Sequence, residues 1–219
     1  MNAETTQPTI VYLVRHGDAI VPLDSEGHRL LYGPDAHLNE AGQAKAALLG
    51  ETLSQTEPIH RVYSSTFPRA RETAELIARK VGVDHLDLNE RIIDTYAPGL
   101  WGTRMDDLAK MGRFGFWDTP TKDQEPAEQI EKRMLSAVDE IVRANPGKTL
   151  VIVGHADPMV ILTYRLHHRE GPLPRMIEME QYALGNAESF RLVLDGQVRI
   201  LAEEAFRQRD GKIVRQPLA

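Results

Sequence analysis

Residues 9–19 read TIVYLVRHGDA, and this stretch decides which architecture the chain can adopt. Residues 9–14 are almost all apolar, which is typical of a strand buried on both faces of a sheet. The strand runs into Arg15, His16 and Gly17. Ligands of open α/β sheets bind beyond the carboxyl ends of the strands. The stretch therefore predicts a buried strand that presents an arginine and a histidine to a ligand site.

A second apolar stretch, residues 149–153, ends in the same way, because it runs into Gly154 and His155. In a parallel sheet the carboxyl ends of neighbouring strands meet at one edge. If 149–153 lies beside 9–14, the side chains of His16 and His155 face each other across one crevice.

A further positive charge follows a shorter strand predicted at 59–63. Arg69 lies in the first turn of the helix predicted at 68–81, and the backbone N–H groups of a helix N-terminus also favour an anion. Like Arg15, it carries a planar guanidinium group, which is well suited to binding phosphate oxygens. Two histidines and two arginines at one edge of the sheet therefore predict a phosphate site.

Strand and helix patterns alternate over most of the chain, which predicts a three-layer α/β/α fold with a mostly parallel central sheet. The expected helices carry apolar residues at helical spacing, and Asn, Pro or Gly residues mark several of their ends. Asp195-Gly196 predicts the turn of a hairpin. We expect strands at 9–14, 59–63, 85–89, 149–153, 189–194 and 197–201, and helices at 39–55, 68–81, 127–144 and 158–164.

Two irregular segments interrupt this alternation. Residues 21–37 are rich in turn residues and are expected to form a long loop. Aromatic and turn residues mix in the second segment, where we expect an insertion at about 91–124 with a short helix near 104–111. Because neither a repeat nor a linker divides the sequence, we expect one domain over residues 1–219.

Composition excludes several classes of protein. The chain has 219 residues, of which 26% are charged and 42% are hydrophobic, and its net charge is −6. This charge argues against a general nucleic-acid binder or a polybasic membrane-surface protein. The sequence contains no cysteine, which excludes disulfides, zinc-thiolate sites and thiol nucleophiles. We see neither a secretory signal pattern nor an apolar run of membrane-spanning length, so we expect a cytoplasmic protein.

The motifs resemble those of the histidine phosphatase superfamily, the phosphoglycerate-mutase-like proteins. Arg15-His16-Gly17 after a strand resembles the signature of that family. Three residues alone are weak evidence, but further blocks follow in the order of the family from about residue 9 to 165. These blocks are HLNEAGQA at 37–44, SSTFPRARETA at 64–74, LNE at 88–90, PAE at 126–128 with Arg133 after it, and VGH at 153–155.

The resemblance implies a mechanism that uses neither a metal nor a cofactor. The first histidine of the family is the nucleophile, which gives His16 that role and implies a phosphohistidine intermediate. Arg15, Arg69 and His155 are implied to bind the phosphate oxygens, and His155 to act in catalysis as well. These fixed groups would stabilise the charge of an in-line transition state.

The resemblance also implies which residue protonates the leaving oxygen and then deprotonates the attacking water. In this chain that residue is Glu90, which stands in the LNE block. Three other carboxylates are alternatives for the role, namely Asp18, Asp94 and Asp157.

Departures from the family pattern bear on the reaction. Pro22 stands where many members have an asparagine that helps to bind phosphate, and Ala156 replaces the glycine that usually follows the second histidine. These changes favour a phosphatase that hydrolyses phosphomonoesters over a cofactor-dependent phosphoglycerate mutase-type phosphotransferase. The mutase stays open as an alternative, as does a non-catalytic phosphate-binding module on the same scaffold.

The two irregular segments are the expected walls of the substrate site. Their aromatic residues favour an aryl phosphate, although packing of the insertion against the domain explains them equally well. We expect a small phosphorylated substrate as the partner, with no nucleic acid and no membrane, and a homodimer stays open. The aromatic residues are Tyr32, Tyr96, Trp101, Phe114, Phe116 and Trp117, and the basic residues beside them are Arg91, Arg104, Lys110, Arg113 and Lys122.

Overall fold

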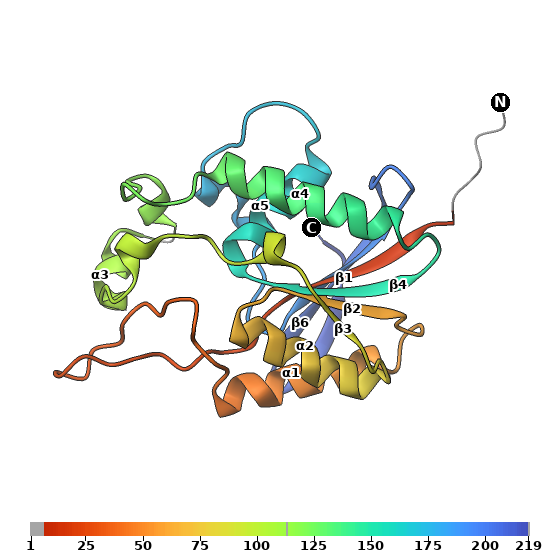
Figure 1. Ribbon diagram of the computed structural model, residues 1–219, viewed down its shortest axis with the longest axis horizontal. Coiled ribbons are helices and arrows are strands. Elements are labelled where there is room, and N and C mark those ends of the chain that lie inside the picture. The colour runs from red at the N-terminus through yellow and green to blue at the C-terminus, as the bar shows by residue number, and fades with distance from the viewer. Residues whose placement is uncertain (1–6, 113, 219) are drawn as a thin grey trace.

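The computed structural model describes residues 7–112 and 114–218, and within them seven strands form one sheet with the order β3-β2-β4-β1-β5-β6-β7 (Figure 1). The four strands β3, β2, β4 and β1 are parallel, and β5, β6 and β7 are antiparallel to their neighbours. The strands are β1 (Thr9–Arg15), β2 (Arg61–Ser64), β3 (Leu86–Leu88), β4 (Thr149–Gly154), β5 (Ser189–Leu194), β6 (Ile200–Arg209) and β7 (Lys212–Gln216).

Helices cover both faces of the sheet, so the predicted three-layer α/β/α architecture is confirmed (Figure 1). The helices α4 and α5 lie on one face, and α1 and α2 lie on the other. The α-helices are α1 (Glu40–Leu53), α2 (Pro68–Val81), α3 (Met105–Lys110), α4 (Ala127–Arg143) and α5 (Ala156–His167), and the short 3-10 helices are η1 (Glu90–Ile92), η2 (Pro98–Leu100), η3 (Gly115–Trp117) and η4 (Met176–Tyr182).

The central strands supply both halves of the core, because successive side chains of a strand point to opposite faces. Val11 and Leu13 of β1 pack with the α4 and α5 side, whereas Tyr12 and Val14 pack with the α1 and α2 side. All four side chains are fully buried. This two-sided burial is the reason that β1 and β4 are nearly continuous in apolar residues.

The structure corrects the prediction for the last hairpin. The second strand was expected at 197–201, but β6 begins at Ile200. The carboxylate of Asp195 accepts hydrogen bonds from the backbone N–H groups of Gln197 and Arg199, so the turn is longer than two residues. The edge strand β7 was not predicted at all, since its residues are mostly exposed and give no apolar pattern.

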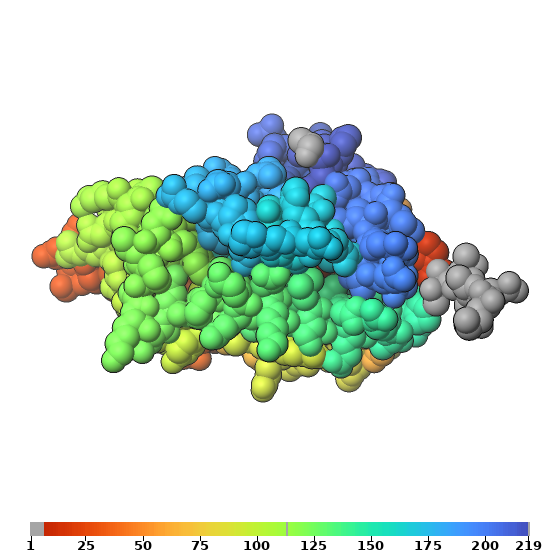
Figure 2. Space-filling model, turned by 90° about the horizontal axis from the view of Figure 1, so that it is seen from above, coloured from red at the N-terminus to blue at the C-terminus, as the bar shows by residue number. Residues whose placement is uncertain are grey.

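The predicted insertion lies against the loop 21–37 at the carboxyl ends of the parallel strands (Figure 1). Backbone hydrogen bonds join the two segments, for example from Leu31 N–H to the carbonyl of Thr103 and from Gly102 N–H to the carbonyl of Leu31. The helix expected near 104–111 is α3. Figure 2 shows both segments together at one end of the molecule.

None of the helices in the described part of the chain is both long enough and apolar enough to cross a membrane.

Candidate active site

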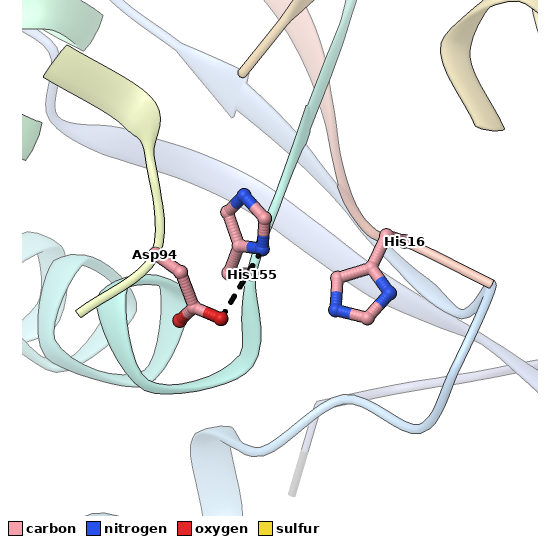
Figure 3. Close-up of side chains that lie close together, drawn as sticks. All are labelled: His16, Asp94 and His155. Carbon is pink, nitrogen blue, oxygen red and sulfur yellow. Dashed lines mark ion pairs between the residues drawn. The ribbon is translucent and has the colours of Figure 1, made fainter. Parts of the chain in front are cut away.

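The register of the sheet brings the two strand-end histidines together. Strands β1 and β4 are parallel neighbours in which Arg15 lies opposite Gly154. A histidine follows directly after the last residue of each strand. The ring centroids of these two residues, His16 and His155, lie 5.1 Å apart. Figure 3 shows the two rings at the ends of their strands, with the carboxylate of Asp94 close to His155.

The turn that follows β1 is held in place by close backbone packing. A Cβ atom on Gly17 would lie 2.5 Å from the carbonyl oxygen of Gly42, so only glycine fits at this position. The backbone N–H of Gly17 also donates to the hydroxyl of Thr73 on α2. The start of α1 and the body of α2 thus fix the backbone that carries His16.

The imidazole of His16 is held in its neutral form. The side chain is 1% exposed, and Nδ1 lies 2.6 Å from the carbonyl oxygen of Gly17. Because a carbonyl only accepts hydrogen bonds, Nδ1 carries the proton and Nε2 keeps its lone pair. Burial lowers the pKa of His16 well below its usual range, and the neighbouring histidine and arginines lower it further.

His155 is fully buried and is oriented by its neighbours. The hydroxyl of Ser65 accepts from the backbone N–H of Phe67 and lies 2.9 Å from His155 Nε2, to which it can donate. This arrangement leaves the ring proton on Nδ1, which lies 3.4 Å from Asp94 Oδ2. Burial is also the main cause that lowers the pKa of His155 well below its usual range. The ring is therefore neutral, and within the described residues its Nδ1 lies near Asp94 without a hydrogen-bond partner.

Arg69 is the most constrained cation of the site. It is 2% exposed, and its Nη2 donates to Asp94 Oδ2 at 2.8 Å. Its Nη1 donates to the carbonyls of Gly33 and Pro34 in the long loop. The guanidinium lies 5.0 Å from the ring centre of Tyr32 and 5.2 Å from that of a phenylalanine on its own chain segment. These contacts fix the guanidinium of Arg69 beside the two histidines.

Arg15 is the second cation of the site, and its Nη1 donates to the carbonyl of Leu184 at 2.8 Å. Within the described residues, the buried Nε atoms of Arg15 and Arg69 have no hydrogen-bond partner. Unpaired buried donors are costly, and a bound anion can satisfy them.

A cavity of about 380 Å³ opens onto these groups, and Arg15, His16, Arg69 and Asp94 form part of its lining. One nitrogen of each histidine and one oxygen of Asp94 lie within 4.8 Å of one another. Two histidines and a carboxylate are also a ligand set for divalent metals. Two arginines beside the same cavity favour an anion over a cation, so a phosphate group fits the charge of the site better than a metal ion.

The four candidate acids differ in where they lie. Glu90 is exposed at the start of η1 and does not line the cavity, so the structure does not bring it to the histidines. Asp18 pairs with Lys45 at 2.8 Å. Asp157 lines the cavity and accepts a hydrogen bond from an indole N–H. Only Asp94 among the four contacts both a histidine and an arginine of the site.

Arg133 belongs to one of the sequence blocks that resemble the family, although no role was inferred for it there. Its guanidinium donates to the backbone carbonyls of Arg91, Ile93 and Asp94, and it also binds both carboxylate oxygens of Glu125. The helix α4 thus holds the irregular segment that carries Asp94. This positioning role could not be predicted from the sequence, because three of the acceptors are backbone carbonyls, which leave no sequence pattern.

We expect replacement of Arg69 by alanine to lower kcat/KM for a phosphomonoester by roughly 10²–10³-fold, the usual cost of removing one donor to transition-state charge. Lysine should restore little of this loss, since a point charge cannot reproduce the fork that contacts Asp94 and the loop carbonyls. Steady-state kinetics on purified variants, with thermal unfolding to check the fold, would measure both effects.

The matched control for this experiment is Arg71→Ala, two residues further along α2. Arg71 is exposed, pairs with Glu75 and does not line the cavity, so its removal should leave the kinetics unchanged. Wild-type kinetics in Arg69→Lys would contradict the role of a planar clamp at position 69.

Comparison with known proteins places the chain among related sequences and folds. Residues 11–202 match the family model described as the histidine phosphatase superfamily (branch 1). Phosphoglycerate mutase-like protein 4 of Arabidopsis thaliana is 27% identical over 215 residues, which are 90% of this chain and 89% of that protein. The metal-independent phosphoserine phosphatase of the same plant is 24% identical over 170 residues, which are 74% of this chain and 70% of that protein. The structure of Bacillus stearothermophilus YhfR has the same fold, with a TM-score of 0.70 and 23% identity over 94% of this chain and 98% of that chain.

Proposed function

The chain belongs to the histidine phosphatase superfamily, and we propose that it hydrolyses phosphomonoesters without a metal, through a phosphohistidine on His16. The observation that supports this most strongly is the state of His16. Its Nδ1 proton is held by a carbonyl, its burial favours the neutral ring, and two arginines line the same cavity. A neutral imidazole beside fixed cations is suited to attack on phosphorus.

In the first step, Nε2 of His16 attacks phosphorus, and the bond from phosphorus to the ester oxygen breaks as the N–P bond forms. Arg15 and Arg69 bind the non-bridging oxygens and stabilise the charge that they carry in the transition state. Asp94 donates a proton to the leaving oxygen, which departs as an alcohol. The Asp94 carboxyl group enters this step with its proton and leaves it as the carboxylate.

In the second step, a water molecule attacks the phosphorus of the phosphohistidine. The Asp94 carboxylate takes a proton from this water, the N–P bond breaks, and its electron pair returns to Nε2. Phosphate leaves, and the neutral His16 ring and the protonated carboxyl group are restored. Among the described residues, Nδ1 of His155 has no hydrogen-bond partner, and in this mechanism it donates to an oxygen of the transferring group.

The relatives include proteins named as a phosphoserine phosphatase and as phosphoglycerate mutase-like, so a mutase-type transfer is the second candidate. It uses the same phosphohistidine and differs only in what receives the phosphoryl group. Pro22, in place of a phosphate-binding asparagine, favours hydrolysis over transfer.

The test is release of phosphate from para-nitrophenyl phosphate by the purified protein in excess EDTA. We expect turnover at the same rate with and without EDTA. Loss of turnover in EDTA with recovery on adding a divalent metal would overturn the metal-independent mechanism and would favour metal binding by the two histidines and Asp94. Absence of phosphate release under all conditions would instead favour a non-catalytic phosphate-binding module.

A further inference from the structure

The charged side chains of the cavity are gathered where the phosphate group would bind. Apart from His16, the charged residues of its lining are Arg15, Arg69, Asp94 and Asp157. Arg69 and Asp94 contact each other, and Asp157 accepts a hydrogen bond from the indole N–H of Trp117. The two cations of the described lining are therefore the two arginines that we propose to bind the phosphate.

The remaining walls are almost entirely apolar. They come from the loop 21–37, the segment after β2, and the predicted insertion, and the neutral hydroxyls of Tyr32 and Thr95 are among their few polar side-chain groups. Large apolar side chains of the lining include Leu100, Trp101, Met105, Leu108, Phe114 and Phe116.

The aromatic residues of the insertion thus contribute to the cavity as well as to packing. Trp101, Phe114 and Phe116 line the cavity. Tyr96 instead packs edge-on against Trp101, with ring centroids 5.5 Å apart. Trp117 is packed against the core and donates to an aspartate. The two explanations that the sequence left open therefore apply to different residues.

None of the described basic residues of the insertion lines the cavity, and three of them pair with acidic residues elsewhere. Arg91 donates to Glu140 on α4, and Lys110 donates to Asp107 within α3. Arg104 pairs with acidic residues at the tip of the long loop. Lys122 is exposed and Arg113 lies outside the described residues.

A second apolar hollow of about 440 Å³ lies behind the same wall. It shares four residues with the cavity, namely Leu31, Tyr32, Gly33 and Trp101, so these residues separate the two hollows. Its further lining includes the exposed side chain of Ile20 and two polar residues, Asp35 and His37.

We propose that the group esterified to phosphate is an uncharged, largely apolar alcohol or phenol. This inference rests on the proposed function and names the substrate class of that site. An apolar leaving group gains free energy by leaving water for these walls. A leaving group with its own carboxylate would lose hydration there and would meet no cation among the described walls beyond the two that hold the phosphate.

The test compares kcat/KM for 2-phenylethyl phosphate with that for O-phosphoserine and 3-phosphoglycerate. All three are esters of primary alcohols, so the basicity of the leaving oxygen does not favour the apolar substrate. We expect the phenylethyl ester to exceed both carboxylated esters by roughly 100-fold, the upper range for discrimination by apolar contacts. Leu108 lies on the α3 wall and is half-buried, so Leu108→Arg would add one cation to the cavity without disturbing the core. This variant should narrow the preference by about tenfold or more, through faster turnover of the carboxylated esters.

The matched control is Asp106→Arg on the same helix. Asp106 is exposed and does not line the cavity, so this change alters the charge of α3 more than Leu108→Arg does, yet should leave the preference unchanged. If both variants reduced the preference for the apolar ester, the effect would come from long-range charge. That result would overturn the proposal that the apolar cavity wall selects the substrate.

The measurements distinguish failure of the proposed substrate class from failure of the proposed phosphatase function. Equal or faster hydrolysis of the carboxylated esters by the wild type would overturn the apolar substrate class and leave the phosphatase assignment standing. No phosphate release from any of the three esters, nor from para-nitrophenyl phosphate, would overturn both.

Discussion

Replacing His16 with alanine should reduce phosphomonoester hydrolysis by more than about 10⁴-fold, as removal of a nucleophile does in other covalent mechanisms. The site offers no second group for the role, because His155 Nε2 is occupied by the hydroxyl of Ser65 and its Nδ1 lies toward Asp94. The loss should appear in kcat, measured with para-nitrophenyl phosphate at saturating concentration.

The same experiment identifies the intermediate. Rapid quenching of the wild type with ³²P-labelled substrate should trap an acid-labile, alkali-stable phosphate on the protein, and His16→Ala should trap none. His85→Ala is the matched control, since this histidine is exposed, pairs with Asp87 and does not line the cavity. It should keep both the turnover and the trapped phosphate. Wild-type turnover in His16→Ala would exclude the phosphohistidine mechanism.

The parallel core of the fold could be predicted from the sequence because burial on both faces leaves a strong pattern. Strands β1 and β4 are buried along almost their whole length, and each was predicted to within one residue of its observed end. The far edge gave no such pattern. Strand β7 has one half-buried side chain among exposed ones, and β6 begins after a turn that a side-chain carboxylate extends.

In the candidate site, too, some positions could be predicted from the sequence and others could not. His16 and His155 were predicted to face each other because both follow buried strands, and parallel neighbours keep a fixed register. The position of the carboxylate could not be predicted in this way. Glu90 and Asp94 lie four residues apart in a segment without repeating backbone geometry, so no periodicity indicates which side chain faces the cavity. Three hydrogen bonds from the guanidinium of Arg133 to backbone carbonyls determine the conformation of that segment.

The second large effect that we expect concerns which of these two carboxyl groups protonates the leaving oxygen. Asp94→Asn should slow hydrolysis of an ester with a poor leaving group, such as phenyl phosphate, by about 10²–10⁴-fold, the usual contribution of general acid–base catalysis. The loss with para-nitrophenyl phosphate should be much smaller for the step that releases the phenol, because para-nitrophenolate leaves without a proton. The measurement is the rate of phenol release in a single turnover, compared across a series of substituted phenyl phosphates.

This dependence on the leaving group separates proton donation from positioning. Asp94 also contacts Arg69 and His155, so its removal could shift the groups that we propose to bind the phosphate. Such a shift would slow every ester by a similar factor, since all of them carry the same phosphate group. Only loss of the acid makes the rate depend steeply on the basicity of the leaving oxygen.

Glu90→Gln is the matched control, because it removes a carboxylate from the same segment at an exposed position outside the cavity. Its rates should equal those of the wild type for every ester in the series. If instead Glu90→Gln showed the steep dependence and Asp94→Asn a uniform loss, the acid would be Glu90, as the family resemblance implies. The segment held by Arg133 would then have to move in the substrate complex, since in the present structure Asp94 is the carboxylate that contacts the histidine and arginine of the site.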